Sequence, residues 1–260
     1  MKDGHIHSPY CNHGTKDPFE DYVKKALEVG LTEMSFTEHL SLPHNIPGVT
    51  DEFLDECGMY IENIMDYIND VKSIKEKYKD SIKINVGFEV DYFEGYEDVT
   101  TKLLEKYGPY IEDSILSTHF VKYEGEFYAV DMLEDFSKLV DKVGSLEKVY
   151  DLYFNTVLKS INSDLGMYKP KRIGHITLVR RFAEQFPHEY RNIELFNKVV
   201  EAIKHRDYEI DYNTAGLRKE LCGETYPSGI FLDIIDKNNI RKVYGSDSHT
   251  ARDVGEGFGL

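Results

Sequence analysis

Short β-like segments alternate with amphipathic helical segments along the whole chain, and this alternation limits the possible folds more than any other feature of the sequence. The predicted strands cover residues 4–8, 33–39, 82–92, 114–121, 172–176, 208–214 and 241–247. The predicted helices lie between them, at residues 17–30, 52–79, 97–107, 132–165, 189–205 and 228–238. A strand–helix–strand order calls for parallel strands joined by crossover helices. We therefore expect an α/β fold in which seven strands close, or nearly close, into a barrel, with residues 1–260 forming a single domain.

The charge balance and the hydropathy pattern exclude several classes of protein. The 260 residues include 31 basic and 47 acidic side chains, a net charge of −16, so the surface repels phosphate backbones and we expect no nucleic-acid partner. No apolar run approaches the roughly 18–20 residues that cross a bilayer, and the N-terminus lacks the apolar core of a signal peptide. We expect a cytoplasmic protein with no membrane partner and with reduced cysteines. The pattern predicts no particular oligomeric state, and we expect a final helix to be missing after the seventh strand.

Histidines gather where a barrel enzyme has its pocket. Side chains at the C-terminal ends of the strands and in the loops after them line that pocket. Six of the ten histidines take such positions: His5, His7, His39, His119, His175 and His249. Glu89 and Asp247 lie at matching places, and His13 lies in the loop after the first strand. This concentration of imidazoles and carboxylates predicts a metal site.

The spacing within this set favours more than one ion. His5 and His7 are two residues apart on a strand and point to the same side, and Asp247 and His249 repeat that spacing. Glu89 lies in an apolar strand, where a carboxylate is costly to bury without a cation. Seven imidazoles and two carboxylates exceed the capacity of one four-coordinate ion. We therefore predict two or three divalent ions bridged by Glu89, and zinc, manganese and iron all suit these mixed nitrogen and oxygen ligands.

The ordered set of motifs resembles a known family. An HxH pair is followed by a histidine six residues later, an EH pair, a strand glutamate, two separate strand-end histidines and a DxH triplet. The stretches that carry them are DGHIHSPYCNHG, SFTEHLSLP, GFEVDY, YGPYIEDSILSTHF, YKPKRIGHITLV, DYNTAGLRK and YGSDSH, which span residues 3 to 249. This order is similar to that of the polymerase and histidinol phosphatase (PHP) superfamily, and within it to the histidinol-phosphate phosphatases.

The resemblance implies a distorted seven-stranded (β/α) barrel, related to the TIM barrel, with a trinuclear metal centre. It implies one ion at His5, His7, Glu89 and Asp247, a second at Glu89, His119 and His175, and a third at His13, His39 and His249. All of these positions carry suitable ligands in this chain. The implied reaction is the hydrolysis of a phosphate monoester, L-histidinol phosphate, to L-histidinol and phosphate in histidine biosynthesis.

The expected mechanism places the catalytic groups among these ligands. Bound metals lower the pKa of a water toward about 7. We expect a hydroxide that bridges the ions at Glu89 to attack phosphorus in line, while the ions hold the non-bridging oxygens. We expect the leaving alkoxide to take its proton from Asp247 or His249.

An acidic protein that binds phosphate also needs arginines, which offer bidentate contacts. Arg218 follows the sixth strand, and Arg180 and Arg181 follow the fifth, so all three can reach the catalytic end of the barrel. We select Arg218 and Arg180 as the phosphate-binding residues. Arg172 begins the fifth strand and is expected at the opposite end.

Further substrate contacts are predicted from position alone. Asn213 ends the sixth strand and is expected to orient a ligand or a water, and His44 in the loop after the second strand is expected to touch substrate. Loop carboxylates and tyrosines are the candidates for recognising the amine and the imidazole of the substrate.

Two other functions stay open at this point. One is a phosphoesterase or exonuclease on the same scaffold that acts on nucleotides, against which the net charge of −16 and the lack of a basic stripe argue. The other is a non-catalytic metal-binding or regulatory module that retains the barrel. The intact ligand set and the candidate phosphate arginines argue against that module.

Overall fold

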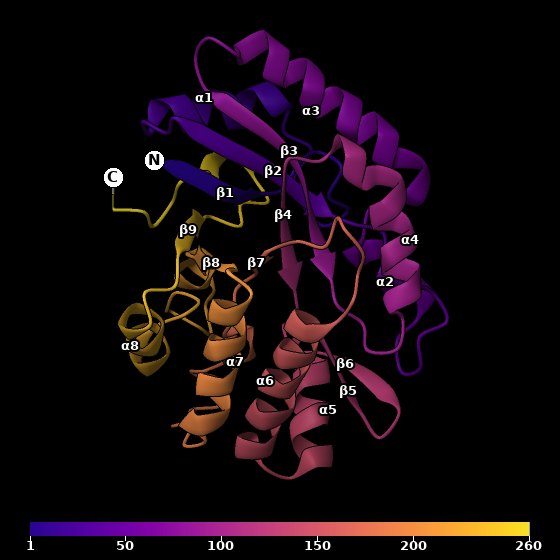
Figure 1. Cartoon of the computed structure of the whole chain (residues 1–260), viewed down its shortest axis with the longest axis vertical. Coiled ribbons are helices and arrows are strands. Elements are labelled where there is room, and N and C mark those ends of the chain that lie inside the picture. The colour runs from indigo at the N-terminus through magenta and orange to yellow at the C-terminus, as the bar shows by residue number, and fades with distance from the viewer. Residues whose placement is uncertain (260) are drawn as a thin grey trace.

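Seven parallel strands form a curled sheet whose first and last strands meet (Figure 1). The computed structural model describes residues 1–259. In spatial order the strands are β1 (Lys2–Ile6), β2 (Glu33–His39), β3 (Lys83–Asp91), β4 (Asp113–Ser117), β7 (Arg172–Ile173), β8 (Glu209–Asn213) and β9 (Lys242–Gly245). Asp247 donates its backbone N–H to the His5 carbonyl (2.8 Å) and His7 donates to the Ser248 carbonyl (2.9 Å), so the chain after β9 joins β1. The predicted distorted α/β barrel is confirmed.

Helices cover the outer face of this barrel (Figure 1). They are α1 (Phe19–Glu28), α2 (Asp51–Cys57), α3 (Ile64–Tyr78), α4 (Glu97–Tyr107), α5 (Leu133–Val143), α6 (Leu146–Asn162), α7 (Ile193–His205) and α8 (Gly229–Lys237). All eight lie in the connections between successive strands of this sheet, and the short α2 precedes α3 in the long connection after β2. Within residues 1–259, no helix is long and apolar enough to cross a membrane.

Two predicted helices are divided by glycines. The predicted helix 52–79 becomes α2 and α3, because Gly58 takes an extended conformation that ends α2. The predicted helix 132–165 becomes α5 and α6, because Gly144 takes a left-handed conformation (φ 73°) that closes α5. Periodicity alone did not show these breaks, since the apolar pattern continues on both sides of each glycine.

The predicted strand 114–121 is also divided. β4 ends at Ser117, and Phe120 begins an antiparallel hairpin of β5 (Phe120–Tyr123) and β6 (Glu126–Ala129). This hairpin packs in a second, smaller apolar cluster that includes Phe93 and Phe127. The hairpin therefore extends one wall of the barrel mouth.

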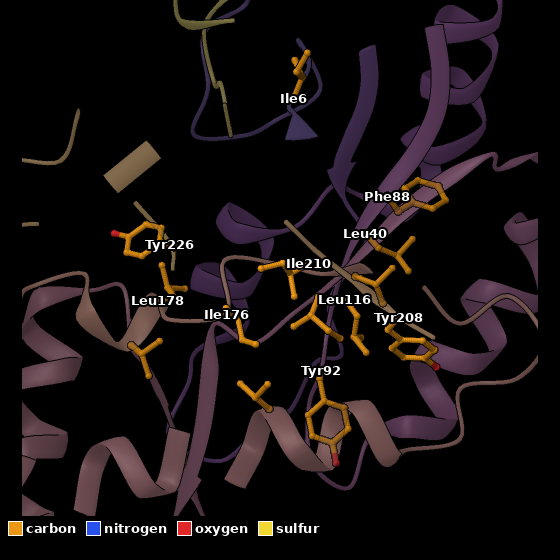
Figure 2. Packing of buried hydrophobic residues seen from close by; sticks show 14 of the residues in the cluster. Ile6, Leu40, Phe88, Tyr92, Leu116, Ile176, Leu178, Tyr208, Ile210 and Tyr226 are labelled. Carbon is orange, nitrogen blue, oxygen red and sulfur yellow. The ribbon is translucent and has the colours of Figure 1, made fainter. Parts of the chain in front are cut away.

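Successive strand residues point to opposite faces of the sheet, and the two faces differ in chemistry. Outward-facing residues are apolar and pack against the helices in the main core. Figure 2 shows part of this core, with Ile6, Phe88, Leu116 and Ile210 labelled. The alternate residues, which point into the barrel, include many buried polar groups: Asp3, His5, Ser35, Asn85, Glu89, Asp91, Ser117, Asp211 and Asn213. The barrel interior therefore holds a hydrogen-bonded polar column.

Arg172 anchors the end of this column that lies opposite the histidines. Its buried guanidinium donates to the Gly4 carbonyl (2.7 Å) and to Asp113 (3.0 Å). Burial by itself raises the pKa of Asp113, but the charges of Arg172 and Lys2 outweigh burial and hold that pKa below its usual value. Arg172 thus lies at the end of the barrel where the sequence places it, and it acts there as a structural cation.

Candidate metal centre

The structure brings all nine predicted ligand side chains to the end of the barrel formed by the C-termini of the strands. They come from β1 and its loop (His5, His7, His13), from β2 and β3 (His39, Glu89), from the segments after β4 and β7 (His119, His175) and from the segment after β9 (Asp247, His249). His13 is exposed, whereas most of the others are buried. Residues that are far apart in the chain therefore meet here, for example His7 and Asp247, whose separation is 240 positions.

The first predicted group is closely packed. His5 Nε2 lies 3.3 Å from Glu89 Oε2 and 3.6 Å from Asp247 Oδ1. His7 Nε2 lies 3.1 Å from the same Asp247 oxygen and 3.5 Å from the same Glu89 oxygen. The two imidazoles therefore face one pair of carboxylate oxygens, an arrangement that a single cation can occupy. Burial by itself lowers the pKa of His5, but the carboxylates of Asp247 and Glu89 outweigh burial and hold it well above its usual value.

Glu89 faces a second group of histidines through its other oxygen. Oε1 lies 2.9 Å from His175 Nε2 and 3.6 Å from His119 Nε2, and it accepts a hydrogen bond from Ser117 Oγ (2.6 Å). Burial alone would raise the pKa of Glu89, yet His5 and His119 hold it well below its usual value. Because its two oxygens face different sets of imidazoles, Glu89 stands between two candidate ion positions.

The third predicted group is more open to solvent. His13 and His249 face each other through their Nε2 atoms at 3.0 Å, and His39 Nδ1 lies 3.2 Å from Glu89 Oε2. The ligand atoms of His39 and His249 also lie within 4.8 Å of the buried Cys11 thiol. The ligand atoms that lie within 4.8 Å of one another here are those of His7, Cys11, His39 and His249, so a third ion held by His13, His39 and His249 stays a prediction.

Five of the histidines are held by acceptors in a common orientation. In each, Nδ1 faces an acceptor and Nε2 faces the cluster: His5 with Asp211 (2.7 Å), His7 with Glu38 (3.2 Å), His119 with Asp91 (2.6 Å), His13 with the Glu56 carbonyl (3.0 Å) and His249 with the Asp247 carbonyl (3.1 Å). Such acceptors keep the ring proton on Nδ1 and leave the Nε2 lone pair for a metal. This orientation is what a multinuclear site requires.

Several ring nitrogens are buried at this site without a hydrogen-bond partner among residues 1–259. They are His5 Nε2, His175 Nδ1 and both nitrogens of His39. Leaving a buried polar atom unpaired is costly, and a cation bound by the lone pair removes that cost. Burial and the neighbouring His7 hold the pKa of His39 well below its usual value, so its imidazole is neutral and able to ligate. The donor set therefore fits divalent metal ions.

Sequence reasoning missed the three carboxylates that orient these histidines. Asp211, Glu38 and Asp91 each accept a hydrogen bond from an imidazole Nδ1. A signal was present, because Asp91 lies two residues after Glu89 and Asp211 lies two residues before Asn213, which places each pair on the inward face of one strand. Glu38 belongs to the EH motif itself.

A cavity of about 1100 Å³ opens above the cluster, and Arg181, Arg218 and the exposed Arg252 line it. Arg218 was predicted there; it donates to the Ser246 carbonyl (2.6 Å) and lies 3.7 Å from Asp253. Arg181 was not selected, yet it also lines the cavity. In both side chains Nη1 is buried with no partner among the described residues. Two guanidinium groups beside the cluster form a cationic wall that suits a phosphate group.

Arg180 lies elsewhere, which corrects the choice made from the sequence. Its guanidinium forms an ion pair with Glu224 (Nη2 to Oε2, 3.1 Å) and is absent from the cavity wall. Consecutive residues in the short helical turn after β7 point in different directions, so Arg181 takes the position expected for Arg180.

His44 and Asn213 also lie outside the cavity wall. His44 is exposed and pairs with Asp55 (2.9 Å). Asn213 is fully buried beneath the cluster, where its amide donates to Asp211 (2.9 Å) and to Asp247 (3.2 Å). Asn213 therefore contacts the predicted ligand Asp247 from below and is too deep to make the substrate contact predicted for it.

An α/β barrel with a histidine-rich centre at the C-terminal ends of its strands is the architecture of a metal-dependent hydrolase. A family model described as the PHP domain matches residues 3–215. A histidinol-phosphatase of Bacillus subtilis (strain 168) is 40% identical, over 99% of this chain and 96% of the relative. The chain therefore belongs to the PHP family.

Solved structures agree with this assignment. A protein from Listeria monocytogenes, assigned as a histidinol phosphatase, superposes with a TM-score of 0.95 at 38% identity, over 99% of this chain and 98% of the other. A histidinol phosphate phosphatase from Lactococcus lactis, solved with zinc, L-histidinol and phosphate, has a TM-score of 0.69 at 19% identity, over 96% of this chain and 86% of the other. The second likeness shows the shared fold.

Proposed function

We propose that the protein is a metal-dependent phosphatase that hydrolyses L-histidinol phosphate to L-histidinol and phosphate. The observation that carries the proposal is the position of Glu89 between two groups of histidines, at a cavity whose wall presents Arg181 and Arg218. The PHP family and the 40% identical histidinol-phosphatase support the choice of substrate.

The nine ligand side chains would hold two or three divalent ions in the three groups described above. When bound, these ions supply positive charge to the phosphate oxygens and lower the pKa of a water that attacks phosphorus. Arg181 and Arg218 hold the phosphate against this centre with their free guanidinium atoms. Asn213 keeps Asp247 in place.

The alkoxide that leaves phosphorus needs a proton. Asp247 and His249 both line the cavity, and we propose that one of them delivers it, directly or through a water. His249 donates from Nδ1 to the carbonyl of Asp247 (3.1 Å), so His249 can deliver this proton only through Nε2, and only when its Nε2 does not hold a metal ion.

Steady-state release of phosphate from L-histidinol phosphate tests the proposal after reconstitution of the metal-free protein with manganese, zinc or iron. We expect turnover that depends on metal and that exceeds turnover of a short DNA oligonucleotide, because a protein of net charge −16 repels a polyanion. Faster hydrolysis of DNA would identify a nucleotide phosphoesterase instead. Stoichiometric metal without hydrolysis of any monoester would identify a binding module.

A further inference from the structure

One wall of the cavity combines a carboxylate with apolar side chains. Asp131 and Met132 come from the segment between β6 and α5, Phe53 comes from α2 and Phe120 from β5. The rings of Phe53 and Phe120 lie edge to face, with their centroids 6.4 Å apart. Met132 is 46% exposed, although its side chain is apolar. This wall offers one negative charge beside a surface that suits a flat ring.

Asp131 lies next to the metal centre. The preceding residue, Val130, donates its backbone N–H to the carbonyl of His119 (2.8 Å), which ties this segment to one of the candidate ligands. Burial and the charge of Asp131 together raise the pKa of the Cys57 thiol, which lines the same cavity. The carboxylate of Asp131 is therefore within electrostatic reach of both the cavity and the cluster.

The carboxylate of Asp131 has no hydrogen-bond or ion-pair partner among residues 1–259 that would give it a structural role. Asp131 is half-buried. It does not cap α5 either, because the N-cap residue is Met132, which makes no side-chain cap hydrogen bond. Two other carboxylates of the same cavity are used: Asp91 bonds to His119, and Asp253 lies beside Arg218. A partly desolvated carboxylate without a partner favours the approach of a cation.

We propose that Asp131 binds the ammonium group of the substrate and that Phe53, Phe120 and Met132 hold its imidazole ring, an inference that rests on the proposed function. Histidinol phosphate carries an ammonium group a few bonds from the phosphate, and that phosphate lies against metal ions and arginines. The ammonium is therefore repelled by the groups that bind the phosphate. A carboxylate on the facing wall offsets this repulsion and adds a charged hydrogen bond. Asp131 selects amine-bearing monoesters over other phosphate monoesters.

The test compares L-histidinol phosphate with the analogue that lacks only the amino group. We expect Asp131→Asn to lower kcat/KM for L-histidinol phosphate by about 10- to 100-fold, the effect of losing a hydrogen bond to a charged group. Hydrolysis of the analogue should change less than about threefold. The control is Asp135→Asn, because Asp135 is ion-paired with Lys138 outside this cavity and should leave both rates unchanged. Metal content and the thermal midpoint are measured for each variant.

The outcomes separate this inference from the proposed function. A wild-type enzyme that does not hydrolyse L-histidinol phosphate overturns both. A wild-type enzyme that hydrolyses the analogue as fast as L-histidinol phosphate overturns the ammonium site alone. A preference for L-histidinol phosphate over the analogue that is as large in Asp131→Asn as in the wild type also overturns the ammonium site alone. A loss of this preference in Glu56→Gln but not in Asp131→Asn also overturns the ammonium site, since Glu56 is an exposed carboxylate on the same cavity. An equal loss on both substrates assigns Asp131 a structural role and also overturns the inference.

Discussion

Replacing Glu89 by glutamine tests the central feature of the site. The two oxygens of Glu89 lie between 2.9 and 3.6 Å from ring nitrogens of five histidines, so a cation held by those nitrogens lies close to the carboxylate. A pair of unit charges about 4 Å apart interacts by about 4 kcal/mol at an effective dielectric constant of 20. Each 1.4 kcal/mol is about a tenfold change in affinity. Glu89→Gln should therefore lower the affinity of the site for each of two ions by roughly a thousandfold.

The assay is elemental analysis after dialysis against buffered metal, with phosphate release measured on the same samples. Metal content and activity should fall together, while circular dichroism shows an intact fold. Ser117→Ala is the matched control, because it removes only the 2.6 Å hydrogen bond to Glu89 and keeps the carboxylate. Ser117→Ala should lower metal affinity or activity by only about 10- to 100-fold, as for other groups that orient metal ligands. Unchanged metal content in Glu89→Gln would refute the bridging role.

Three further predictions address the groups around the centre. Asp91→Asn should lower metal affinity or activity by about 10- to 100-fold, and competition with a fluorescent chelator measures it; wild-type affinity and activity would contradict the orienting role. Arg181→Ala should lower kcat/KM by about 10- to 100-fold, as expected when a bond to a charged group is lost, whereas Arg180→Ala should have little effect. Steady-state kinetics measures both variants, and a larger loss in Arg180→Ala would identify Arg180 as the phosphate-binding residue. Arg172→Met should lower the free energy of unfolding at pH 7 by about 3–5 kcal/mol, because Asp113 loses its buried counter-charge. Since the folded protein lowers the pKa of Asp113, its stabilising contribution is present above the unfolded value of about 3.9 and is lost as pH falls through the folded value. The difference in urea unfolding between the two proteins should therefore shrink below pH 4 or so, and a difference that stays constant with pH would contradict this pairing.

The barrel was predictable because its signal is local. Alternation of strand and helix patterns predicts parallel strands, and the period of two within a strand places His5 and His7 on one side whatever the rest of the chain does. The hairpin of β5 and β6 was not predictable in the same way, because Phe120 leaves the sheet to join apolar side chains of distant loops. The sequence also did not show which arginine of the turn after β7 faces the cavity. Arg180 bonds instead to Glu224, a partner that is distant in the chain.

By itself, the sequence determined the barrel, its family and the candidate ligands, because those depend on side-chain direction along single strands and on an ordered set of motifs. That these side chains bind metal is still a prediction, and the structure supplies the geometry that supports it. Only the tertiary structure decided which acceptor orients each imidazole, as in the bond between His5 and Asp211 across 206 positions. It also decided that Arg181 and not Arg180 lines the cavity, and that Asp131 has no partner within residues 1–259. These properties arise from contacts between segments far apart in the chain, and the spacing of residues in a sequence does not encode which distant side chain fills a given space.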